Sequence, residues 1–596
     1  MRQFEQYPNL VTMFFRRARE EGDKPFLWRK QDGAWQSISW AEAARRVSAL
    51  AAGLKGLGLR SGDRVMLVSE NRPEWCIADL GIMAAGCVTV PTYTTNTERD
   101  HLHILENSGS AAVIVSTEKL AKTLLPAVLR SDTTRHVISM DSVKLPQGGD
   151  VSFHRWEDLL ATPADVSAAE DQAARMQRGD LACIIYTSGT GGAPRGVQQH
   201  HGAILKNVEG CVQIIEEDFG WGEEVFLSFL PLSHAYEHSG GQYLPIGLGG
   251  QIYYAESMEK LAANIEETRP TIMVVVPRLF EVLRQRIVKN IEKQGGLAAK
   301  LLDQALAIGA KDLEGRKSWR DKPIDLALDA LFRPTIRKRF GGRMKAMVSG
   351  GAPLNPEIGI FFHSLGLMVL QGYGQTEAGP VISCNRPKVG IGMHTVGRPL
   401  KDVEVKIAED GEILCRGELV MHGYWQNDAE SARVLKDGWL HTGDIGHLDD
   451  KGRIVITDRK KDLIVNDKGD NVSPQKVEGM LTLQPEILQA MIYGDRRPYL
   501  VGLIVPDPEW TAEWSVRNDY KCDFAALAYN PMYKAALMSA VDRVNKDLSV
   551  IEKVRRIVVA DQPFSIENEQ MTPSLKIRRH VLKQVYGARL DALYKG

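Results

Sequence analysis

The chain has 596 residues, of which 44% are hydrophobic and 7% aromatic, and its formal net charge is −1. This length predicts two or more domains, and the composition is typical of a globular protein with large buried cores. A net charge near zero, with no nucleic-acid-binding motif, excludes a protein that relies on a basic surface to bind DNA or RNA.

We expect neither a targeting segment nor a membrane-spanning one from the residues of this chain. Its first residues do not show the charged-then-apolar pattern of a signal peptide, and no run approaches the ~20 apolar residues of a membrane-spanning helix. The cysteines are scattered and form no Cys-x-x-Cys pair, so we expect small buried thiols, a reducing cytoplasmic location and no zinc site. They are Cys76, Cys87, Cys183, Cys211, Cys384, Cys415 and Cys522.

Helical and strand periods alternate from about residue 10 to residue 180. The expected elements are a helix over 40–58, a strand over 64–68, a helix over 78–85, a strand over 87–90 closed by Pro91, and a strand over 111–115. Strands that alternate with helices predict parallel sheets covered on both faces. Apolar runs over 181–185, 272–276 and 345–348 extend this α/β region towards residue 400.

A helical, strongly basic insertion interrupts this region at about 284–345. Leucines recur at helical spacing within it, at Leu297, Leu301, Leu302 and Leu306, and predict an apolar face that packs. Its basic residues include Arg333, Arg337, Lys338, Arg339, Arg343 and Lys345. Two interpretations stay open: a solvated helical hairpin on the surface, and a site of peripheral contact with anionic lipid on the inner face of the membrane.

Beyond residue 400 the pattern changes to short strands. The strands expected over 403–407, 412–416 and 453–457 are separated by Asp-Gly and Lys-Gly turns, which favour hairpins and a small β-barrel-like part. The charged run over 458–462 is expected to be an exposed connector, and the remainder to be a small α+β domain. We therefore expect an N-terminal domain over 1–457, a hinge over 458–463 and a C-terminal domain over 464–596.

The most informative stretch is Tyr-Thr-Ser-Gly-Thr-Gly-Gly-Ala-Pro-Arg-Gly over 186–196, directly after an apolar strand. Glycines and hydroxyls in this place let backbone N–H and side-chain O–H groups surround phosphate oxygens without a Cβ in the way. It is not a Walker loop, because the Gly-Lys-Ser/Thr ending is absent. The stretch therefore predicts a phosphate-binding loop of another kind.

This string resembles the phosphate loop of the adenylate-forming (AMP-binding) enzymes, which include acyl- and aryl-CoA synthetases, the adenylation domains of peptide synthetases, and firefly luciferase. The usual form reads Tyr-Thr-Ser-Gly-Thr-Thr-Gly-x-Pro-Lys-Gly. This chain has Gly191 in place of the second Thr, which removes one hydroxyl donor, and Arg195 in place of the Lys, which keeps a cation for the departing pyrophosphate. The resemblance implies that ATP is bound by Thr187, Ser188, Gly189, Thr190, Gly191 and Gly192.

Two further motifs resemble the same family. Residues 349–354, which include Gly351, Ala352 and Pro353, are similar to the segment that lies along the adenine. Residues 371–377 are similar to the next motif, which comprises Gln371, Gly372, Tyr373, Gly374, Gln375, Thr376 and Glu377. The resemblance implies that Tyr373 stacks on adenine, Thr376 bonds the α-phosphate, and Glu377 holds Mg²⁺ together with Thr190. A flat ring, a hydroxyl and a hard carboxylate suit these partners.

The resemblance continues to the end of the chain, in the family's order. Residues 439–446 are similar to the ribose motif and assign Asp444 to the ribose hydroxyls, while residues 458–464 are similar to the family's hinge, with Arg459 on the nucleotide and Lys461 at the pivot. Lys576, after a Thr-Pro turn, falls where the family has a lysine that reaches the α-phosphate from the small domain. Gly469 lies in a stretch that resembles the loop that meets coenzyme A once the small domain has rotated.

The implied reaction activates a carboxylic acid as an acyl-adenylate and transfers the acyl group to coenzyme A. Residues 230–238 and 276–281, and the insertion that follows, look like the long-chain branch, so a long-chain fatty acid is the expected substrate. His234 is placed near the carboxylate end, with a structural histidine as the alternative. Two other functions stay open: loading a separate carrier protein, and a non-catalytic ATP-binding scaffold at a membrane. The sequence does not indicate an oligomeric state.

Overall fold

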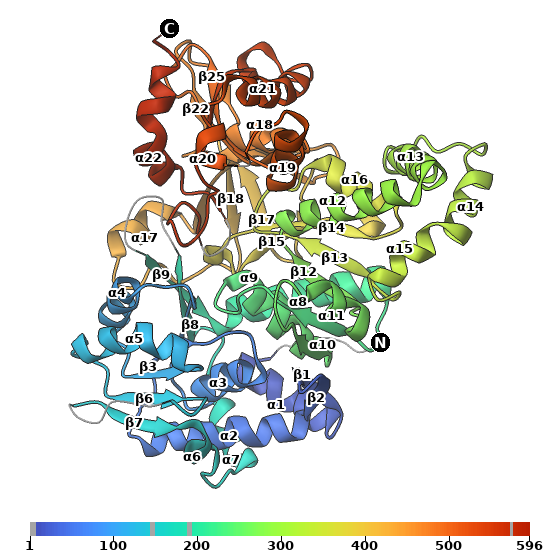
Figure 1. The fold of residues 1–596 in the computed structure, drawn as a ribbon. Helices are drawn as coiled ribbons and strands as arrows, with labels where there is room; N and C mark the ends of the chain where they lie inside the picture. The colour runs from blue at the N-terminus through green and yellow to red at the C-terminus, as the bar shows by residue number, and fades with distance from the viewer. Residues whose placement is uncertain (1–6, 144–149, 188–193, 522, 573–575, 596) are drawn as a thin grey trace.

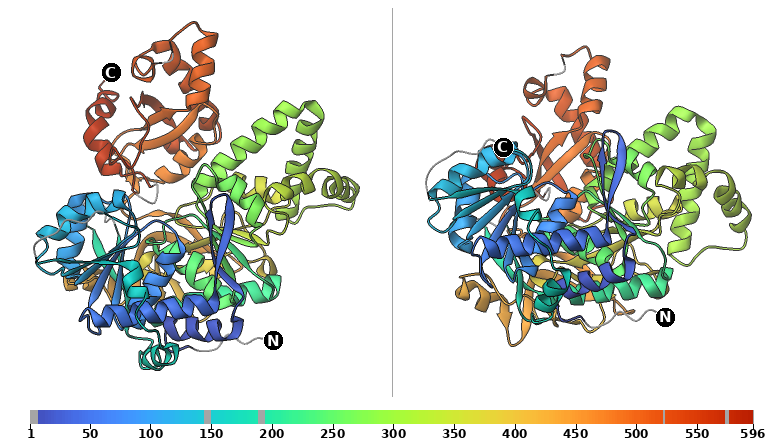
Figure 2. Two further views of the ribbon diagram at one scale, coloured as in Figure 1. Left: turned by 60° about the horizontal axis from the view of Figure 1, so that its bottom comes forward. Right: turned by 90° about the horizontal axis from the view of Figure 1, so that it is seen from below.

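The computed structural model describes residues 7–143, 150–187, 194–521, 523–572 and 576–595. They form a large N-terminal body and a smaller C-terminal domain, which lies above the body in Figure 1. Figure 2 shows the same division from two further sides. The predicted fold class, a large α/β part with parallel sheets followed by a small α+β part, is confirmed.

The first sheet is parallel except at one edge. Within the described residues its strand order is β7-β6-β5-β3-β4-β8-β9, and only β9 runs antiparallel to its neighbour. The strands are β3 (Arg64–Val68), β4 (Val88–Thr92), β5 (Ala112–Val115), β6 (His136–Ser139), β7 (Ser152–Arg155), β8 (Leu181–Thr187) and β9 (Arg195–His200). Side chains alternate across it: Val65 and Leu67 enter one apolar cluster, and Met66 and Val68 enter another.

Helices cover both faces of this sheet. The first cluster is completed by α1 (Leu10–Glu21), α2 (Trp40–Gly56) and α3 (Pro73–Ala84), and the second by α4 (Glu98–Ser108) and α5 (Glu118–Arg130). Two short helices, α6 (Trp156–Leu160) and α7 (Val166–Ala173), follow β7. Burial on both faces explains why these strands are continuous apolar runs.

The second sheet has a parallel centre and antiparallel edges. In the described chain its order is β16-β15-β14-β13-β12-β10-β11-β1-β2. The strands are β1 (Pro25–Gln31), β2 (Ala34–Ser39), β10 (Val225–Ser228), β11 (Gln251–Tyr254), β12 (Ile272–Val275), β13 (Ala346–Ser349), β14 (Val369–Gly374), β15 (Val381–Cys384) and β16 (Arg398–Pro399). The connecting helices are α8 (His201–Phe219), α9 (Ala235–Glu237), the π-helix η1 (His238–Tyr243), α10 (Leu244–Leu248), α11 (Leu261–Thr268) and α16 (Pro356–Ser364).

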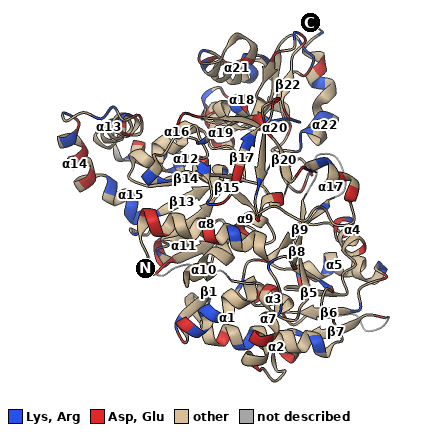
Figure 3. Ribbon diagram, turned by 180° about the vertical axis from the view of Figure 1, so that it is seen from behind, with Lys and Arg blue, Asp and Glu red and all other residues tan. Residues whose placement is uncertain are grey.

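The insertion is a group of four helices at the edge of the body in Figure 1. They are α12 (Pro277–Gln294), α13 (Gly296–Leu313), α14 (Lys322–Leu331) and α15 (Arg333–Arg339). Leu302 of α13 packs in the same apolar cluster as Phe361 and Phe362 of α16, and Leu301 and Leu306 pack against that cluster, which confirms the predicted apolar face for these three leucines. The prediction is wrong for Leu297, which is 76% exposed because it stands in the first turn of α13. Figure 3 shows acidic and basic residues interspersed over these helices.

Most basic residues named in the insertion are engaged within the protein. Arg333 donates to Asp325 at 2.7 Å and Arg337 to Asp329 at 2.8 Å. Arg343 donates to a backbone carbonyl, and Lys345 pairs with Glu224, which directly precedes β10. Among the described residues, Lys338, Arg339 and Arg343 are exposed and form no ion pair, and of these three Arg343 is held by backbone carbonyls.

The third sheet is antiparallel, as its turn residues predict. It contains β17 (Glu404–Ile407), β18 (Glu412–Arg416), β19 (Leu435–Lys436), β20 (Trp439–Leu448) and β21 (Ile454–Arg459). Gly411 and Gly452 stand in the predicted turns with φ of +82° and +70°, a region that glycine adopts without strain. The shorter helices of this part are η2 (Thr376–Ala378), η3 (Pro387–Val389) and α17 (Asp428–Val434).

The C-terminal domain combines two small sheets with helices. The sheets comprise β22 (Ile464–Val465) with β23 (Asn471–Val472), and β24 (Ile487–Tyr493) with β25 (Leu500–Pro506) and β26 (Val554–Val559). The helices are α18 (Pro474–Leu481), α19 (Pro508–Arg517), α20 (Phe524–Leu527), α21 (Pro531–Asn545), η4 (Val550–Glu552) and α22 (Arg579–Ala592). Its apolar residues form separate clusters from those of the body, as expected of a domain with its own core.

Three expectations from the sequence need correction. The strand at Val88 does not close before Pro91 but continues through it to Thr92, because a proline near the end of a strand removes only one N–H group. The helix expected from Ala78 begins at Pro73, since proline fits the first helical turn. The charged run over 458–462 is not wholly exposed: β21 extends into it and Asp458 is buried.

The described cysteines behave as expected. Cys76, Cys87, Cys183, Cys384 and Cys415 are buried, Cys211 is half-buried, and all six are free thiols. Cys522 lies outside the described residues. Among the described helices, none combines the length and apolarity needed to cross a bilayer.

Candidate active site

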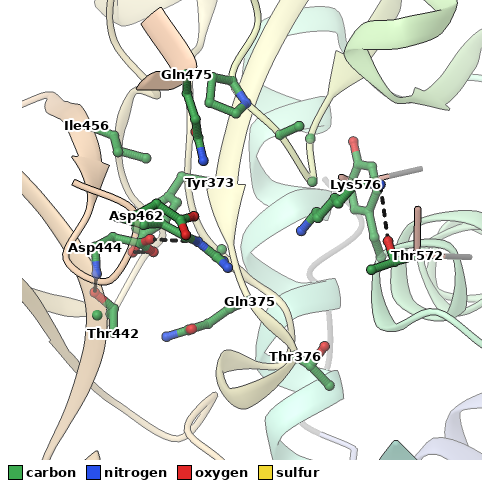
Figure 4. Close-up of a pocket in the computed structure, with 18 of the residues that line it drawn as sticks. Tyr373, Gln375, Thr376, Thr442, Asp444, Ile456, Asp462, Gln475, Thr572 and Lys576 are labelled. Atoms are coloured by element: carbon green, nitrogen blue, oxygen red, sulfur yellow. Dashed lines mark hydrogen bonds and ion pairs between the residues drawn. The ribbon is translucent and has the colours of Figure 1, made fainter. Parts of the chain in front are cut away.

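A cavity of about 2280 Å³ separates the N-terminal body from the C-terminal domain. Its walls come from the ends of the phosphate loop, the segment after β13, strand β14, the third sheet, the hinge and the C-terminal domain. Figure 4 shows part of it, with Tyr373 and Asp444 on one side and Lys576 pointing into the same space from the other. Motifs separated by up to several hundred residues therefore meet in one place.

The segment assigned to adenine lies along this cavity. Gly350, Gly351, Ala352 and Pro353 all line it. Gly351 has a φ of +80°, and a Cβ on Gly350 would lie 2.7 Å from the Tyr236 ring, so the close approach of these two segments requires glycine. The hydroxyl of Tyr236 donates to the Val348 carbonyl at 2.8 Å and fixes the end of β13.

The aromatic and ribose motifs are joined directly. The hydroxyl of Tyr373 donates to Asp444 Oδ2 at 2.7 Å, and Arg459 Nε lies 3.2 Å from Asp444 Oδ1. Asp444 and Arg459 face each other as cross-strand partners of β20 and β21. The Asp444 side chain is buried, and its charge is compensated by the guanidinium. Burial, with Asp444 nearby, raises the pKa of Tyr373, so the phenol remains a neutral donor.

The rest of that motif supports the carboxylate assigned to the metal. Gln371 is buried and donates to the Met393 carbonyl at 2.6 Å, and Gly372 and Gly374 also line the cavity. A Cβ on Gly374 would lie 1.8 Å from the Pro380 carbonyl oxygen, so only glycine fits there. Thr376 lines the cavity, and Glu377 accepts a hydrogen bond from the Tyr424 hydroxyl at 2.8 Å.

Glu377 has the chemistry that Mg²⁺ needs. Mg²⁺ is typically held by one or two carboxylates together with substrate phosphates and waters, so a single carboxylate at the cavity wall is sufficient on the protein side. Thr190, the second proposed ligand, lies outside the described residues, as do Ser188, Gly189, Gly191 and Gly192. Thr187 and Arg195, on either side of that segment, line the cavity.

Arg195 is held by two residues that the sequence motifs do not include. Its guanidinium lies 4.6 Å from the centre of the Tyr424 ring and pairs with Glu430 of α17. Because Tyr424 also donates to Glu377, one tyrosine links the cation of the phosphate loop to the proposed metal ligand. Neither Tyr424 nor Glu430 stands in a phosphate-binding pattern, so this link was visible only in the structure.

Lys576 brings the C-terminal domain into the site. Burial lowers its pKa to about 8, and the positive charge of Arg459 acts in the same direction, while nearby carboxylates oppose both. Its backbone N–H donates to the Thr572 hydroxyl at 3.1 Å, next to an isolated β-bridge between Met571 and Ile577. Residues 573–575 lie outside the described residues.

His234 and Lys576 share this cavity. Burial lowers the pKa of His234 to about 4, and the charge of Lys576 lowers it further. His234 Nδ1 accepts from the Tyr236 N–H at 3.2 Å and caps α9, so the ring is neutral and its Nε2 is the remaining polar atom. His234 thus has a structural partner and also lines the cavity, and its place near the carboxylate of the substrate stays a prediction.

The hinge and the coenzyme A loop are placed differently. Lys461 is exposed and lines the cavity, whereas Lys460 pairs with Glu412 at 3.1 Å. Gly469, with a φ of +88°, turns the chain between β22 and β23 and does not line the cavity. The structure thus brings Lys576 to the nucleotide motifs and leaves Gly469 away from them.

An apolar arm of the cavity was not identified from the sequence. It is lined by small and apolar side chains from five elements. They are Cys211, Ile214, Ile215 and Phe219 of α8, Gly240 of η1, Leu244 of α10, Ile272 and Val274 of β12, and Ala346 and Val348 of β13. These residues have the same composition as an ordinary core, so no local pattern distinguishes them.

Known proteins share both the sequence and the fold. The AMP-binding enzyme family matches residues 14–425, and the family of AMP-binding enzyme C-terminal domains matches residues 461–596. The long-chain-fatty-acid–CoA ligase FadD15 of Mycobacterium tuberculosis is 31% identical over 99% of this chain and 97% of that protein. The long-chain-fatty-acid–CoA ligase 6 of Mus musculus is 30% identical over 99% of this chain and 87% of that protein.

A solved structure agrees at the level of the fold. The adenylation domain of a carboxylate reductase from Mycobacterium chelonae superimposes with a TM-score of 0.76 at 21% identity, over 99% of this chain and 92% of that one. Together with the nucleotide motifs that converge on one cavity, these matches identify the chain as a member of the AMP-binding enzyme family.

Proposed function

We propose that this enzyme is a long-chain fatty-acid–CoA ligase. It activates the fatty acid with ATP to an acyl-adenylate, releasing pyrophosphate, and then transfers the acyl group to the thiol of coenzyme A, releasing AMP. The observation that carries the proposal is the meeting of Lys576, Asp444 and Glu377 in a cavity that also has an apolar arm. Its long-chain-ligase relatives, which match nearly the whole chain, support the same substrate class.

Each residue has a task in the first half-reaction. Asp444 accepts from the ribose hydroxyls, Tyr373 lies against the adenine, and Thr376 donates to the α-phosphate. Lys576 and Arg195 stabilise the charge that builds on the phosphates as the carboxylate attacks in line and pyrophosphate leaves. Mg²⁺ held by Glu377, with Thr190 as the second proposed ligand, supplies further neutralisation of the phosphate charge when bound. Because the protein forms no covalent bond, catalysis consists of positioning and electrostatic stabilisation.

The apolar arm is the proposed site of the alkyl chain. Its residues come from α8, from η1 and α10, and from the second sheet, and His234 and Tyr236 line the same cavity. Each methylene buried there contributes about 0.8 kcal/mol, so a long chain gains substantially over a short one. We place the carboxylate of the acid beside the neutral His234, which adds no charge that competes with Lys576 for it.

The second half-reaction requires a different position of the C-terminal domain. Gly469 and its neighbours lie away from the cavity, so they serve coenzyme A only after this domain rotates about Lys461. The turn is preformed: Asn466 Oδ1 accepts from the Lys468 and Asp470 N–H groups at 2.9 and 2.8 Å. A rotation that changes few backbone angles is sufficient for such an exchange.

The alternatives are less well supported. Loading of a free carrier protein uses the same first half-reaction and differs only in the thiol. A non-catalytic scaffold has no use for Lys576, Asp444 and Glu377 together in one cavity. Four of the six named basic residues, Arg333, Arg337, Arg343 and Lys345, are engaged within the protein, so these four do not support contact with anionic lipid.

A direct assay separates these functions. Purified protein is incubated with Mg·ATP, coenzyme A and a series of acids from acetate to oleate, and AMP release is measured. We expect AMP release that requires coenzyme A and a long acid. Pyrophosphate exchange without any effect of coenzyme A would favour a carrier protein as the acceptor, and no reaction with any acid while ATP still binds would contradict the ligase function.

A further inference from the structure

The outward face of helix α14 in the insertion is apolar along its whole length. Its exposed side chains, apart from Lys322 at the start, are Pro323, Ile324, Leu326, Ala327, Ala330 and Leu331. Leu326 is 69% exposed and Leu331 78%, and Trp319 just before the helix is 74% exposed. At 100° per residue these six positions cover an arc of about 160° that contains no polar side chain. Single exposed apolar residues are ordinary, but a continuous face of this kind marks an interaction surface.

The acidic residues of α14 are turned away from this face. Asp325 accepts from Arg333 at 2.7 Å and pairs with Lys317 at 2.6 Å, and Asp329 accepts from Arg337 at 2.8 Å. These pairs neutralise both carboxylates on the inner side of the helix. The basic residues that the sequence singled out thus serve to hold α14, and the outward face is left without negative charge.

Unpaired basic residues flank the apolar face at both ends. Arg320 and Lys322 are exposed at the start of α14, and Lys338 and Arg339 are exposed on α15 just beyond its end. Lys322, Lys338 and Arg339 form no ion pair within the described chain, and Arg320 stacks over the Trp319 ring at 5.5 Å. An apolar stripe with a tryptophan and a basic rim is the combination found in helices that lie at a membrane surface.

We propose that α14, together with Trp319, docks on the surface of a phospholipid bilayer that contains anionic headgroups. In Figures 1 and 2 the helix projects at the edge of the molecule, away from the C-terminal domain, so a flat surface can reach it. The apolar face enters the interfacial region, and the basic residues at both ends meet the headgroup charge. None of these residues lines the active-site cavity, so the docking does not depend on the proposed function.

Charge also decides between a bilayer and a second copy of the chain. A two-fold pairing of α14 with α14 sets basic ends against basic ends, whether the helices run parallel or antiparallel. Like charges at both ends oppose that pairing, whereas an anionic surface complements them. The bilayer is therefore the occupant that this face fits.

The test is flotation of the full-length protein with vesicles, without ATP or coenzyme A. We expect it to float with vesicles of phosphatidylglycerol mixed with phosphatidylcholine, and much less with phosphatidylcholine alone or at high salt. The double substitution Leu326→Ser with Leu331→Ser should lower the partition coefficient at least ~10-fold, because two side chains no longer enter the lipid. Val516→Ser with Val550→Ser is the matched control, since both residues are exposed (84% and 73%) but lie in the C-terminal domain, and it should float like the wild type.

Three results would overturn the proposal. They are the absence of flotation with anionic vesicles, flotation of the Leu326→Ser and Leu331→Ser protein equal to that of the wild type, and a lipid-independent dimer that the same pair of substitutions dissociates. The last result would identify a second copy as the occupant. Melting temperatures verify that each variant folds, and AMP release with a water-soluble acid, measured on the same samples, reports separately on the proposed function.

Discussion

The lowered pKa of Lys576 predicts an alkaline limit for the adenylation half-reaction. The ammonium, not the neutral amine, stabilises the charge that builds on the α-phosphate, so adenylation needs protonated Lys576. Burial together with Arg459 sets its pKa at about 8 in the enzyme without substrate. The protonated fraction is therefore nearly complete at pH 6.5 and falls to about one tenth at pH 9.

The assay is ATP–pyrophosphate exchange with a long-chain acid, measured from about pH 6.5 to 9.5. Because kcat/KM reports ionisations of the free enzyme, its value for ATP should be level at low pH and fall roughly 10-fold by pH 9. Lys576→Arg is the matched control, since a guanidinium stays charged throughout this range. It should be slower, because its geometry differs, but its rate should not fall on the alkaline side.

Removal of the charge tests the same reasoning by a second route. Lys576→Ala should lower adenylation by about 10²–10³-fold, the usual loss when one positioned charge-stabilising group is removed. Formation of acyl-CoA from supplied acyl-AMP should change little, because Gly469 and not Lys576 is expected at the site in that step. An equal loss in both half-reactions, or an alkaline limb that persists in Lys576→Arg, would refute the assignment.

Three further predictions concern the cavity and its support. Asp444→Asn should weaken AMP binding by about 10- to 100-fold in calorimetry, because a hydrogen bond to a charged group contributes about 1.5–3 kcal/mol. Asp450→Asn, at an exposed position, is the control and should bind AMP as the wild type does. Burial raises the pKa of Glu237 to about 8, so the free energy of unfolding should fall progressively as pH rises from about 4.5 to 8. In urea unfolding, Glu237→Gln should remove this pH dependence and be more stable than the wild type by a few kcal/mol at pH 9. Parallel curves of stability against pH for the two proteins would contradict this prediction. A Cβ on Gly240 would lie 2.9 Å from Val274 in the apolar arm, so Gly240→Val should exclude the end of a long alkyl chain. Loss of contact with four methylenes costs about 3 kcal/mol, so kcat/KM for a long acid should fall roughly 200-fold and that for acetate should not change. An equal loss for all acids would indicate misfolding instead.

The sequence predicted those parts of the molecule in which chemistry or burial restricts each residue. Strands such as Arg64–Val68 and Glu412–Arg416 coincide with their predicted limits, because burial on both faces or a glycine turn determines where they end. Tyr373, Asp444 and Lys576 were named from motifs and lie around one cavity. In each case the local residues alone carry the constraint.

The remainder depends on contacts between distant segments. The apolar arm is built from residues that are individually indistinguishable from core, so only the arrangement of α8 against the second sheet reveals it. The basic residues of the insertion predicted a charged surface. In the structure, Arg333 and Arg337 pair with Asp325 and Asp329, each of which lies about two helical turns earlier in the chain. Tyr424 and Glu430 acquire their roles only because the third sheet places them beside Arg195.

The contacts that hold the C-terminal domain indicate why one cavity can serve two steps. Asn355 donates to the Gly479 carbonyl at 3.3 Å, Leu483 packs against the apolar cluster of the insertion and α16, and Lys289 pairs with Glu509 on an exposed surface. An exposed ion pair contributes only about 0–1 kcal/mol, and the hydrogen bond is long, so these contacts orient the domain without locking it. By contrast, Arg579 and Glu478 form a largely buried pair inside that domain, with two hydrogen bonds of 2.6 Å. Strong contacts within the domain and weak contacts across the cavity are what a rigid-body rotation requires, and this is the rotation that the proposed function uses to exchange Lys576 for the segment around Gly469.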